Sequence, residues 1–121
     1  MASHLYSEGY ALAYGDSPGF GSPQNAARLS GLSEIADSLE MELVDFLEGS
    51  DVSNPDGILM KQFNLARGML QVDGVINLPK LKTHGLTRMT GAVKNLFGCL
   101  PGVPKAAFHA RLQDEWRFGQ M

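Results

Sequence analysis

The chain has 121 residues and a mass of 13.1 kDa, which allows one domain around a single core. Apolar residues make up 44% of it and charged residues 19%, a balance that excludes an intrinsically disordered chain. The one cysteine, Cys99, excludes an intrachain disulfide and cannot alone supply the four thiolates of a usual iron–sulfur cluster. No apolar run approaches the length of a membrane span and no signal-peptide pattern is readable, so we expect a cytoplasmic protein with no membrane partner.

Acidic and basic residues are separated along the chain. Residues 1–73 contain eleven acidic and three basic residues, whereas residues 74–113 contain six basic residues and no acidic one. Such a stretch is either a solvated basic face or an anion site. The formal net charge of the whole chain is −3 and its basic residues are not interleaved with aromatic ones, so we expect no nucleic-acid partner.

The first 46 residues predict a strand–helix–strand unit. After a tail of residues 1–9, the mostly apolar run Tyr10–Tyr14 reads as a strand and continues into a glycine-rich loop. Ser22 followed by proline is typical of a helix start, and Gly31 is expected to interrupt the helical segment. The run Met41–Phe46 predicts the second strand, and two strands joined by helix are expected to pair in parallel.

The rest of the chain predicts a hairpin, a third strand and two more helices. Asn54–Gly57 has the composition of a tight turn and is expected to close a β-hairpin. Asp73–Leu78 predicts a third core strand, and helical spacing of apolar residues from Thr87 predicts a helix. A further helix is expected over residues 105–116. Together these elements predict a three-layer α/β domain, with a mainly parallel sheet, flanking helices and one β-hairpin.

One loop follows the first predicted strand, and ligands of open α/β sheets bind beyond the C-terminal ends of the strands. This loop, residues 15–22, has neither the ending of a P-loop nor the glycine fingerprint of dinucleotide-binding proteins. It is either a tight turn in which Asp16 and Ser17 cap backbone groups, or an anion site made of backbone N–H groups.

A second loop, residues 80–85, follows the third predicted strand and carries two amines, a hydroxyl and an imidazole. In an extended segment Lys80, Lys82 and His84 share one face, which can clamp a phosphate or a carboxylate. The imidazole of His84 can also act as an acid or a base. The alternative is an exposed loop with no ligand.

The two loops are expected to meet, because the loops that follow parallel strands lie at one edge of a sheet. We therefore expect Asp16, Lys82 and His84 near one cleft, with Lys94 close by. His84 and Asp16 are the catalytic candidates, and no set of metal ligands is assigned. The ligand-binding candidates are the polar and basic residues Ser17, Lys80, Lys82, Thr83, Lys94, Asn95, His109 and Arg111.

The stretch Ile76–Gly98, INLPKLKTHGLTRMTGAVKNLFG, resembles the DUF362 family, with support from Gly15–Gly19 and Leu43–Phe46. The resemblance covers roughly residues 10–112 and implies that residues 1–121 form a single DUF362-like domain, incomplete relative to the family module. Family members are commonly described as iron–sulfur or ferredoxin-like, because many carry separate cysteine-rich motifs. This chain has none, so we expect no iron–sulfur cluster on this chain alone; the resemblance implies a ferredoxin-like partner instead.

Three functions remain open at this point. The first is the binding of a small anionic molecule in redox-related metabolism through the basic loop, with or without catalysis. The second is a non-catalytic interaction module that docks an acidic redox partner through the same stretch. The third is a metal-centred enzyme that uses His84, His109 and Asp16.

We also expect a homo-oligomer, because a parallel sheet needs covered faces and protected edges and few strands are readable here. A second chain can supply them by edge pairing or by exchange of residues 106–118, which include Trp116. The alternative is that this C-terminal segment folds back on its own domain.

Overall fold

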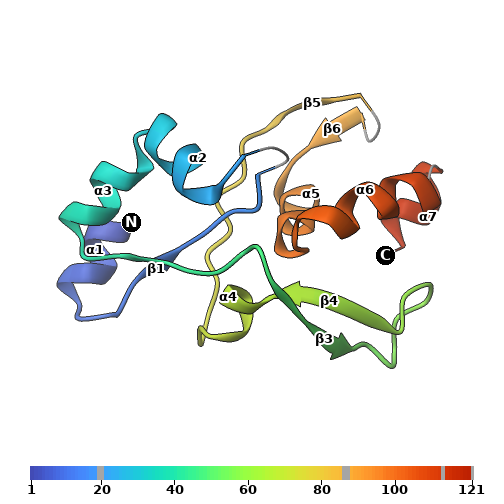
Figure 1. The fold of residues 1–121 in the computed structure, drawn as a ribbon, viewed down its shortest axis with the longest axis horizontal. Coiled ribbons are helices and arrows are strands. Elements are labelled where there is room, and N and C mark those ends of the chain that lie inside the picture. The colour runs from blue at the N-terminus through green and yellow to red at the C-terminus, as the bar shows by residue number, and fades with distance from the viewer. Residues whose placement is uncertain (19–20, 86–87, 113, 121) are drawn as a thin grey trace.

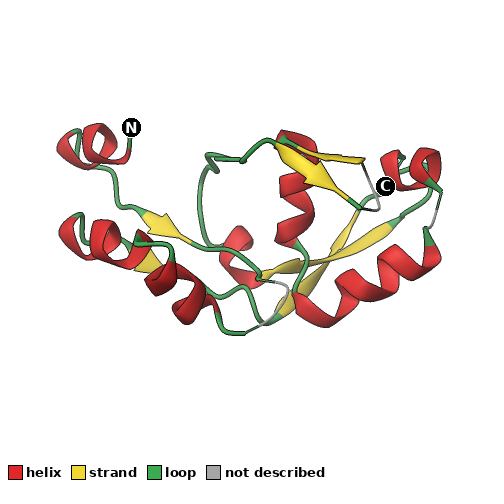
Figure 2. Ribbon diagram, turned by 90° about the horizontal axis from the view of Figure 1, so that it is seen from above, coloured by secondary structure: helices red, strands yellow, loops and turns green. Residues whose placement is uncertain are grey.

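The computed structural model describes residues 1–18, 21–85, 88–112 and 114–120 and shows a mixed α/β chain, as predicted (Figure 1). Its helices are α1 (Ala2–Ser7), α2 (Pro23–Leu29), α3 (Leu32–Ser38), α4 (Arg67–Leu70), α5 (Ala92–Leu96), the 3₁₀ helix η1 (Phe97–Cys99), α6 (Gly102–Arg111) and α7 (Glu115–Gly119). Its strands are β1 (Ala13–Tyr14), β2 (Glu42–Leu43), β3 (Gly49–Ser53), β4 (Gln62–Ala66), β5 (Lys82–His84) and β6 (Arg88–Thr90). Figures 1 and 2 show α1 to α3 at one end of an elongated molecule and α6 and α7 at the other.

The parallel pairing of the first two predicted strands is confirmed, over a shorter length than expected. Ala13 pairs with Glu42, and Tyr14 pairs with Leu43. The N–H of Glu42 also donates to the carbonyl of Leu12 at 3.1 Å, and the N–H of Val44 donates to the carbonyl of Tyr14 at 3.0 Å. No third strand of the described chain pairs with either of the two.

The residues that start and divide the helical segment act as predicted. The Ser22 hydroxyl accepts a hydrogen bond from the N–H of Asn25 at 3.2 Å, and Pro23 is the first residue of α2. Gly31 has a φ of +74°, which glycine adopts without the penalty of a side chain, and it separates α2 from α3. Residues 1–9, expected as a tail, begin with α1.

The β-hairpin predicted at the Asn54–Gly57 turn is confirmed. Strands β3 and β4 pair antiparallel over five residues each. At the turn, the N–H of Gly57 donates to the carbonyl of Asn54 at 3.0 Å, and the Asn54 side chain donates to the carbonyl of Met60 at 2.9 Å. Across the strands the Asn64 amide donates to the Asp51 carboxylate at 2.8 Å, so this directly opposed pair is joined by a side-chain hydrogen bond.

The predicted third core strand, Asp73–Leu78, is wrong. These residues form the connection between α4 and β5 and are assigned to no strand (Figure 1). A strand needs a hydrogen-bonded neighbour, and none of the residues described here supplies one. The described strands form three separate two-stranded sheets, parallel in β1–β2 and antiparallel in the other two. The three-layer domain with a mainly parallel sheet is therefore not confirmed.

The C-terminal part differs from prediction at the helix starts. The loop expected over residues 80–85 and the beginning of the next helix instead form a second hairpin, β5–β6. Helix α5 starts only at Ala92, after Gly91 in an extended conformation with φ −147°. The helix expected over residues 105–116 is present as α6 followed by the separate helix α7.

The buried core is small for a chain of this size. The buried apolar residues in the described part include Phe46, Phe97 and Leu100, together with alanines of α2, α3 and β4. The accessible surface is 8562 Å², whereas a compact monomer of 13.1 kDa exposes about 6,400 Å². The chain is therefore open, and much apolar surface that a compact domain would bury faces solvent.

Candidate functional site

The β5–β6 hairpin determines which side chains lie together in the basic stretch. Thr83 pairs with Met89, His84 with Arg88, and Lys82 with Thr90. Residues directly opposite one another point to the same face, as do residues two apart along a strand. Lys82, His84, Arg88 and Thr90 therefore share one face of the hairpin, as the extended segment predicted for Lys82 and His84.

Arg88 is a candidate that the sequence analysis missed as a site residue. It faces His84 and has a φ of +58°, in the left-handed region that is uncommon for residues other than glycine. No sequence signal pointed to Arg88, because the helical spacing from Thr87 predicted a helix rather than a strand at this position. Only the hairpin register shows that Arg88 is opposite His84.

Lys94 lies on α5, within electrostatic range of Lys82. Burial lowers the pKa of Lys94 below its usual value, and the positive charge of Lys82 lowers it further. The Lys94 ammonium also sits 4.6 Å from the ring centroid of Phe97, in a cation–π contact. Helix α5 follows β6 directly, so the hairpin that carries Lys82 and the helix that carries Lys94 are adjacent elements.

The hydroxyl of Thr90 is buried without a hydrogen-bond partner among the described residues. Thr90 is 8% exposed and stands opposite Lys82 in the hairpin. A buried hydroxyl without a partner costs about 1–3 kcal/mol, so such groups normally have a partner from solvent or ligand. The base of the hairpin is the end where β5 begins at Lys82 and β6 ends at Thr90. It carries the Lys82 amine and the unsatisfied Thr90 hydroxyl, and it leads into the helix of Lys94.

Asn95 has a structural contact rather than an open side chain. Its amide donates to the Asn77 side-chain oxygen at 2.8 Å, and the Asn77 amide donates to the carbonyl of Ala92 at 2.8 Å. The two asparagines tie the segment before β5 to α5. They therefore hold Lys94 and the hairpin in their relative positions.

The first loop approaches α5 from its C-terminal side. The Asp16 carboxylate accepts a hydrogen bond from the N–H of Ser17 at 2.8 Å, the turn-capping contact that the sequence allowed. A methyl group placed on Gly98 would lie 3.4 Å from the Asp16 oxygen, so the carboxylate is next to η1. Ser17 is buried and Asp16 is exposed. Asp16 thus lies near the helix that carries Lys94, and its convergence with His84 in one cleft stays a prediction.

The remaining candidates are more scattered. Lys80 and Thr83 are exposed, as is Arg111 at the end of α6. The side chain of His109 lies outside the described part of the structure. No group of three or more histidine, cysteine, aspartate or glutamate side chains that could hold a metal occurs within the described residues.

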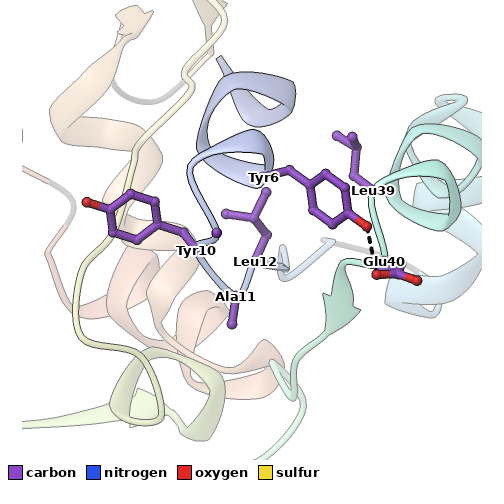
Figure 3. A pocket seen from close by; sticks show the side chains of 7 residues that line it. Tyr6, Tyr10, Ala11, Leu12, Leu39 and Glu40 are labelled. Atoms are coloured by element: carbon purple, nitrogen blue, oxygen red, sulfur yellow. Dashed lines mark hydrogen bonds between the residues drawn. The ribbon is translucent and has the colours of Figure 1, made fainter.

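A surface hollow lies elsewhere, between α1, the residues that follow it and the end of α3 (Figure 3). The Tyr6 hydroxyl donates to the Glu40 carboxylate at 2.7 Å, and this contact raises the pKa of Tyr6 above its usual value. Tyr10 points away from Tyr6 in Figure 3, so the two rings do not enclose a ligand. None of the predicted site residues lines this hollow.

Comparison with known families identifies the chain. The model of the family described as a domain of unknown function, DUF362, matches residues 1–121, so the chain belongs to the DUF362 family. It is also 41% identical over 108 residues to "Thylakoid-associated protein sll1697" of Synechocystis sp. (strain ATCC 27184 / PCC 6803 / Kazusa). The match covers 88% of this chain and 33% of that relative, so the chain spans about a third of the relative's length. No solved structure matches the chain significantly.

Within the described residues, no helix is long and apolar enough to cross a bilayer.

Proposed function

We propose that the chain binds a small anionic molecule at the base of the β5–β6 hairpin. The observation that carries this proposal is the buried, unsatisfied hydroxyl of Thr90 opposite Lys82, in a strand that leads directly into the helix of Lys94. Two like charges held near each other repel, and an anion between them removes that cost and gains charge-assisted hydrogen bonds. A phosphate or a carboxylate has the required acceptors, and Thr90 can donate to either.

The basic character of the surrounding surface supports the same proposal. Lys80 and Lys82 make no ion pair with the described residues, whereas Arg67 pairs with Glu48 at 2.8 Å on the other hairpin. No acidic residue occurs between positions 74 and 113 to neutralise the stretch. If the bound anion is a substrate, His84 on the same hairpin face is the acid–base candidate and Asp16 is the second catalytic candidate.

A second function, docking of an acidic redox partner, is favoured by the exposure of Lys80, Lys82, Thr83 and Arg88. The redox-related role and the ferredoxin-like partner rest on the family resemblance. A protein partner needs an extended surface, whereas the first proposal needs only the base of the hairpin. The metal-centred alternative depends on the placement of His109 and stays a prediction.

Location is a proposal of the same kind. The sequence predicts a cytoplasmic chain, and the name of the Synechocystis relative associates that protein with thylakoids. We propose a cytoplasmic location, with thylakoid association as the second candidate. Fractionation of cells that express the full natural protein separates the two.

Replacing Lys82 with alanine should raise the dissociation constant for inorganic phosphate at least about tenfold, because one charge-assisted contact is worth about 1.5–3 kcal/mol. Phosphate is titrated at low ionic strength and followed by isothermal calorimetry or amide NMR shifts. Lys61→Ala is the matched control: it removes the same charge from the β3–β4 hairpin, where the Lys61 amine donates to the carbonyl of Pro55 at 2.8 Å.

A second variant makes the same test independent of net charge. Thr90→Val keeps the shape of the side chain and removes the unsatisfied hydroxyl, so it should weaken phosphate binding while raising the free energy of unfolding by about 1 kcal/mol. Equal phosphate affinities for Lys82→Ala, Thr90→Val and Lys61→Ala would rule out an anion site at this position. Binding of an acidic protein without any phosphate binding would favour the docking function.

A further inference from the structure

The segment between α4 and β5 has the character of an unpaired strand. Its apolar side chains on one face are exposed, with values of 54% for Ile76 and 72% for Leu78. Among the described residues, the peptide groups of residues 73–81 make no backbone hydrogen bond. Backbone groups of an apolar segment that lack partners are the usual template for pairing with another strand.

One face of this segment is already occupied by its own chain. Asn77 is held to α5 through Ala92 and Asn95, and Leu81 lies close to Gly91 at the start of that helix. In an extended backbone, residues 77, 79 and 81 share this face, and Ile76, Leu78 and Lys80 share the opposite one. Pro79 favours the extended conformation for Leu78, so the segment is suited to a strand.

The two edges of the segment differ in what they can offer to a neighbour. Residues 75, 77 and 79 direct their peptide groups to one edge, where Pro79 has no N–H to donate. Ile76, Leu78 and Lys80 direct theirs to the other edge, and all three carry an N–H. Only this second edge, which we call the Leu78 edge, offers an uninterrupted set of donors and acceptors.

We propose that the Leu78 edge pairs antiparallel with the same edge of a second copy of this chain. A two-fold axis at Leu78 places Leu78 opposite Leu78 and Ile76 opposite Lys80, so that no like charges face each other. The chain as a whole exposes about 2,200 Å² more than a compact monomer of its mass. A standard protein–protein interface takes about 800 Å² from each partner, so the chain has surface to bury against a second copy. The proposal does not depend on anion binding. The Leu78 edge uses peptide groups of residues 76–80, whereas the proposed anion site uses the side chains of Lys82, Lys94 and Thr90.

Two proline substitutions at neighbouring positions test the pairing. Ile76→Pro removes an N–H from the Leu78 edge, whereas Val75→Pro removes one from the opposite edge; both replace a half-exposed apolar side chain. Sedimentation velocity at micromolar concentration should give twice the chain mass of 13.1 kDa for the unmodified chain and for Val75→Pro. Ile76→Pro should raise the dimer dissociation constant by at least about tenfold.

Circular dichroism of both variants establishes that their secondary structure is retained. A monomeric unmodified chain, or equal weakening by the two prolines, would overturn the proposal. A dimer that resists Ile76→Pro but dissociates on Trp116→Ala would overturn it in favour of exchange of the C-terminal segment. If the Leu78 edge is correct, Ile76→Pro leaves phosphate binding at the hairpin unchanged.

Discussion

Replacing Phe46 with alanine should lower the free energy of unfolding by about 3–5 kcal/mol, the largest effect we expect from a single substitution in this chain. Phe46 is 7% exposed and ends the segment that carries β2. Its ring packs directly over Gly15, and Val44 beside it contacts Gly68 in α4. The ring thus joins the segment after β2 to the first loop, while Val44 makes the contact with α4. Among the described residues few other large side chains are buried.

Urea denaturation followed by circular dichroism measures this loss. Tyr10→Ala is the control, because Tyr10 is 63% exposed and its removal should change the free energy of unfolding by no more than about 0.5 kcal/mol. Phe46→Leu should retain most of the stability and keeps the comparison measurable if the alanine variant does not fold. A loss below about 1 kcal/mol for Phe46→Ala would show that this contact does not organise the core.

Replacing Gly15 with alanine should cost about 1–3 kcal/mol, because the added methyl group has no room. Its ideal position is 2.5 Å from Cδ2 of Phe46 and 3.2 Å from Cγ2 of Val44. Gly74→Ala is the matched control: a methyl group there has no atom within 4 Å, so the change should be neutral or slightly stabilising.

A double-mutant cycle separates this clash from any backbone effect at Gly15. In the Phe46→Ala background the ring is gone, so Gly15→Ala should cost much less than in the unmodified chain. Equal costs in both backgrounds would show that the penalty does not come from Phe46.

The features that the sequence predicted well depend on neighbouring residues. The Ser22 cap, the break at Gly31 and the Asn54–Gly57 turn each need only a few adjacent positions, and all three are present. The parallel β1–β2 pair follows from the short strand–helix–strand connection. These signals are independent of the rest of the fold.

The features that it missed depend on residues distant in sequence. Asp73–Leu78 has a strand-like composition, but a strand forms only beside a partner, and none is present in the described chain. Helical spacing at Met89 and Val93 indicated a helix face, yet these side chains are 60% and 86% exposed. Phe97, from the same spacing, is 8% exposed, so the spacing marked a contact with the core only at its C-terminal end.

The candidate site was predicted in part for the same reason. Lys82 and His84 could be placed on one face from the period of an extended segment, and Lys94 was expected nearby. The opposition of Arg88 to His84 and of Thr90 to Lys82 depends on the hairpin register, which no short motif encodes. The buried hydroxyl of Thr90, which supports the proposed function, therefore became visible only in the structure.

The proposed site also makes stability depend on pH in a defined direction. Because burial and Lys82 lower the pKa of Lys94 in the folded chain, the unfolded chain binds more protons between the lowered pKa and the usual value of 10.5. The contribution of Lys94 to stability therefore rises as the pH increases through that window. A bound dianion favours the charged amine and should reduce this dependence.

The pKa of Lys94, followed by NMR of its side-chain ¹³Cε with and without saturating phosphate, tests the proposed anion site most directly. We expect the value to lie below 10.5 in the free chain and to rise when phosphate binds, while the signal of Lys61 stays constant. A Lys94 pKa that does not change at phosphate concentrations that saturate the chain would contradict an anion site between Lys82 and Lys94.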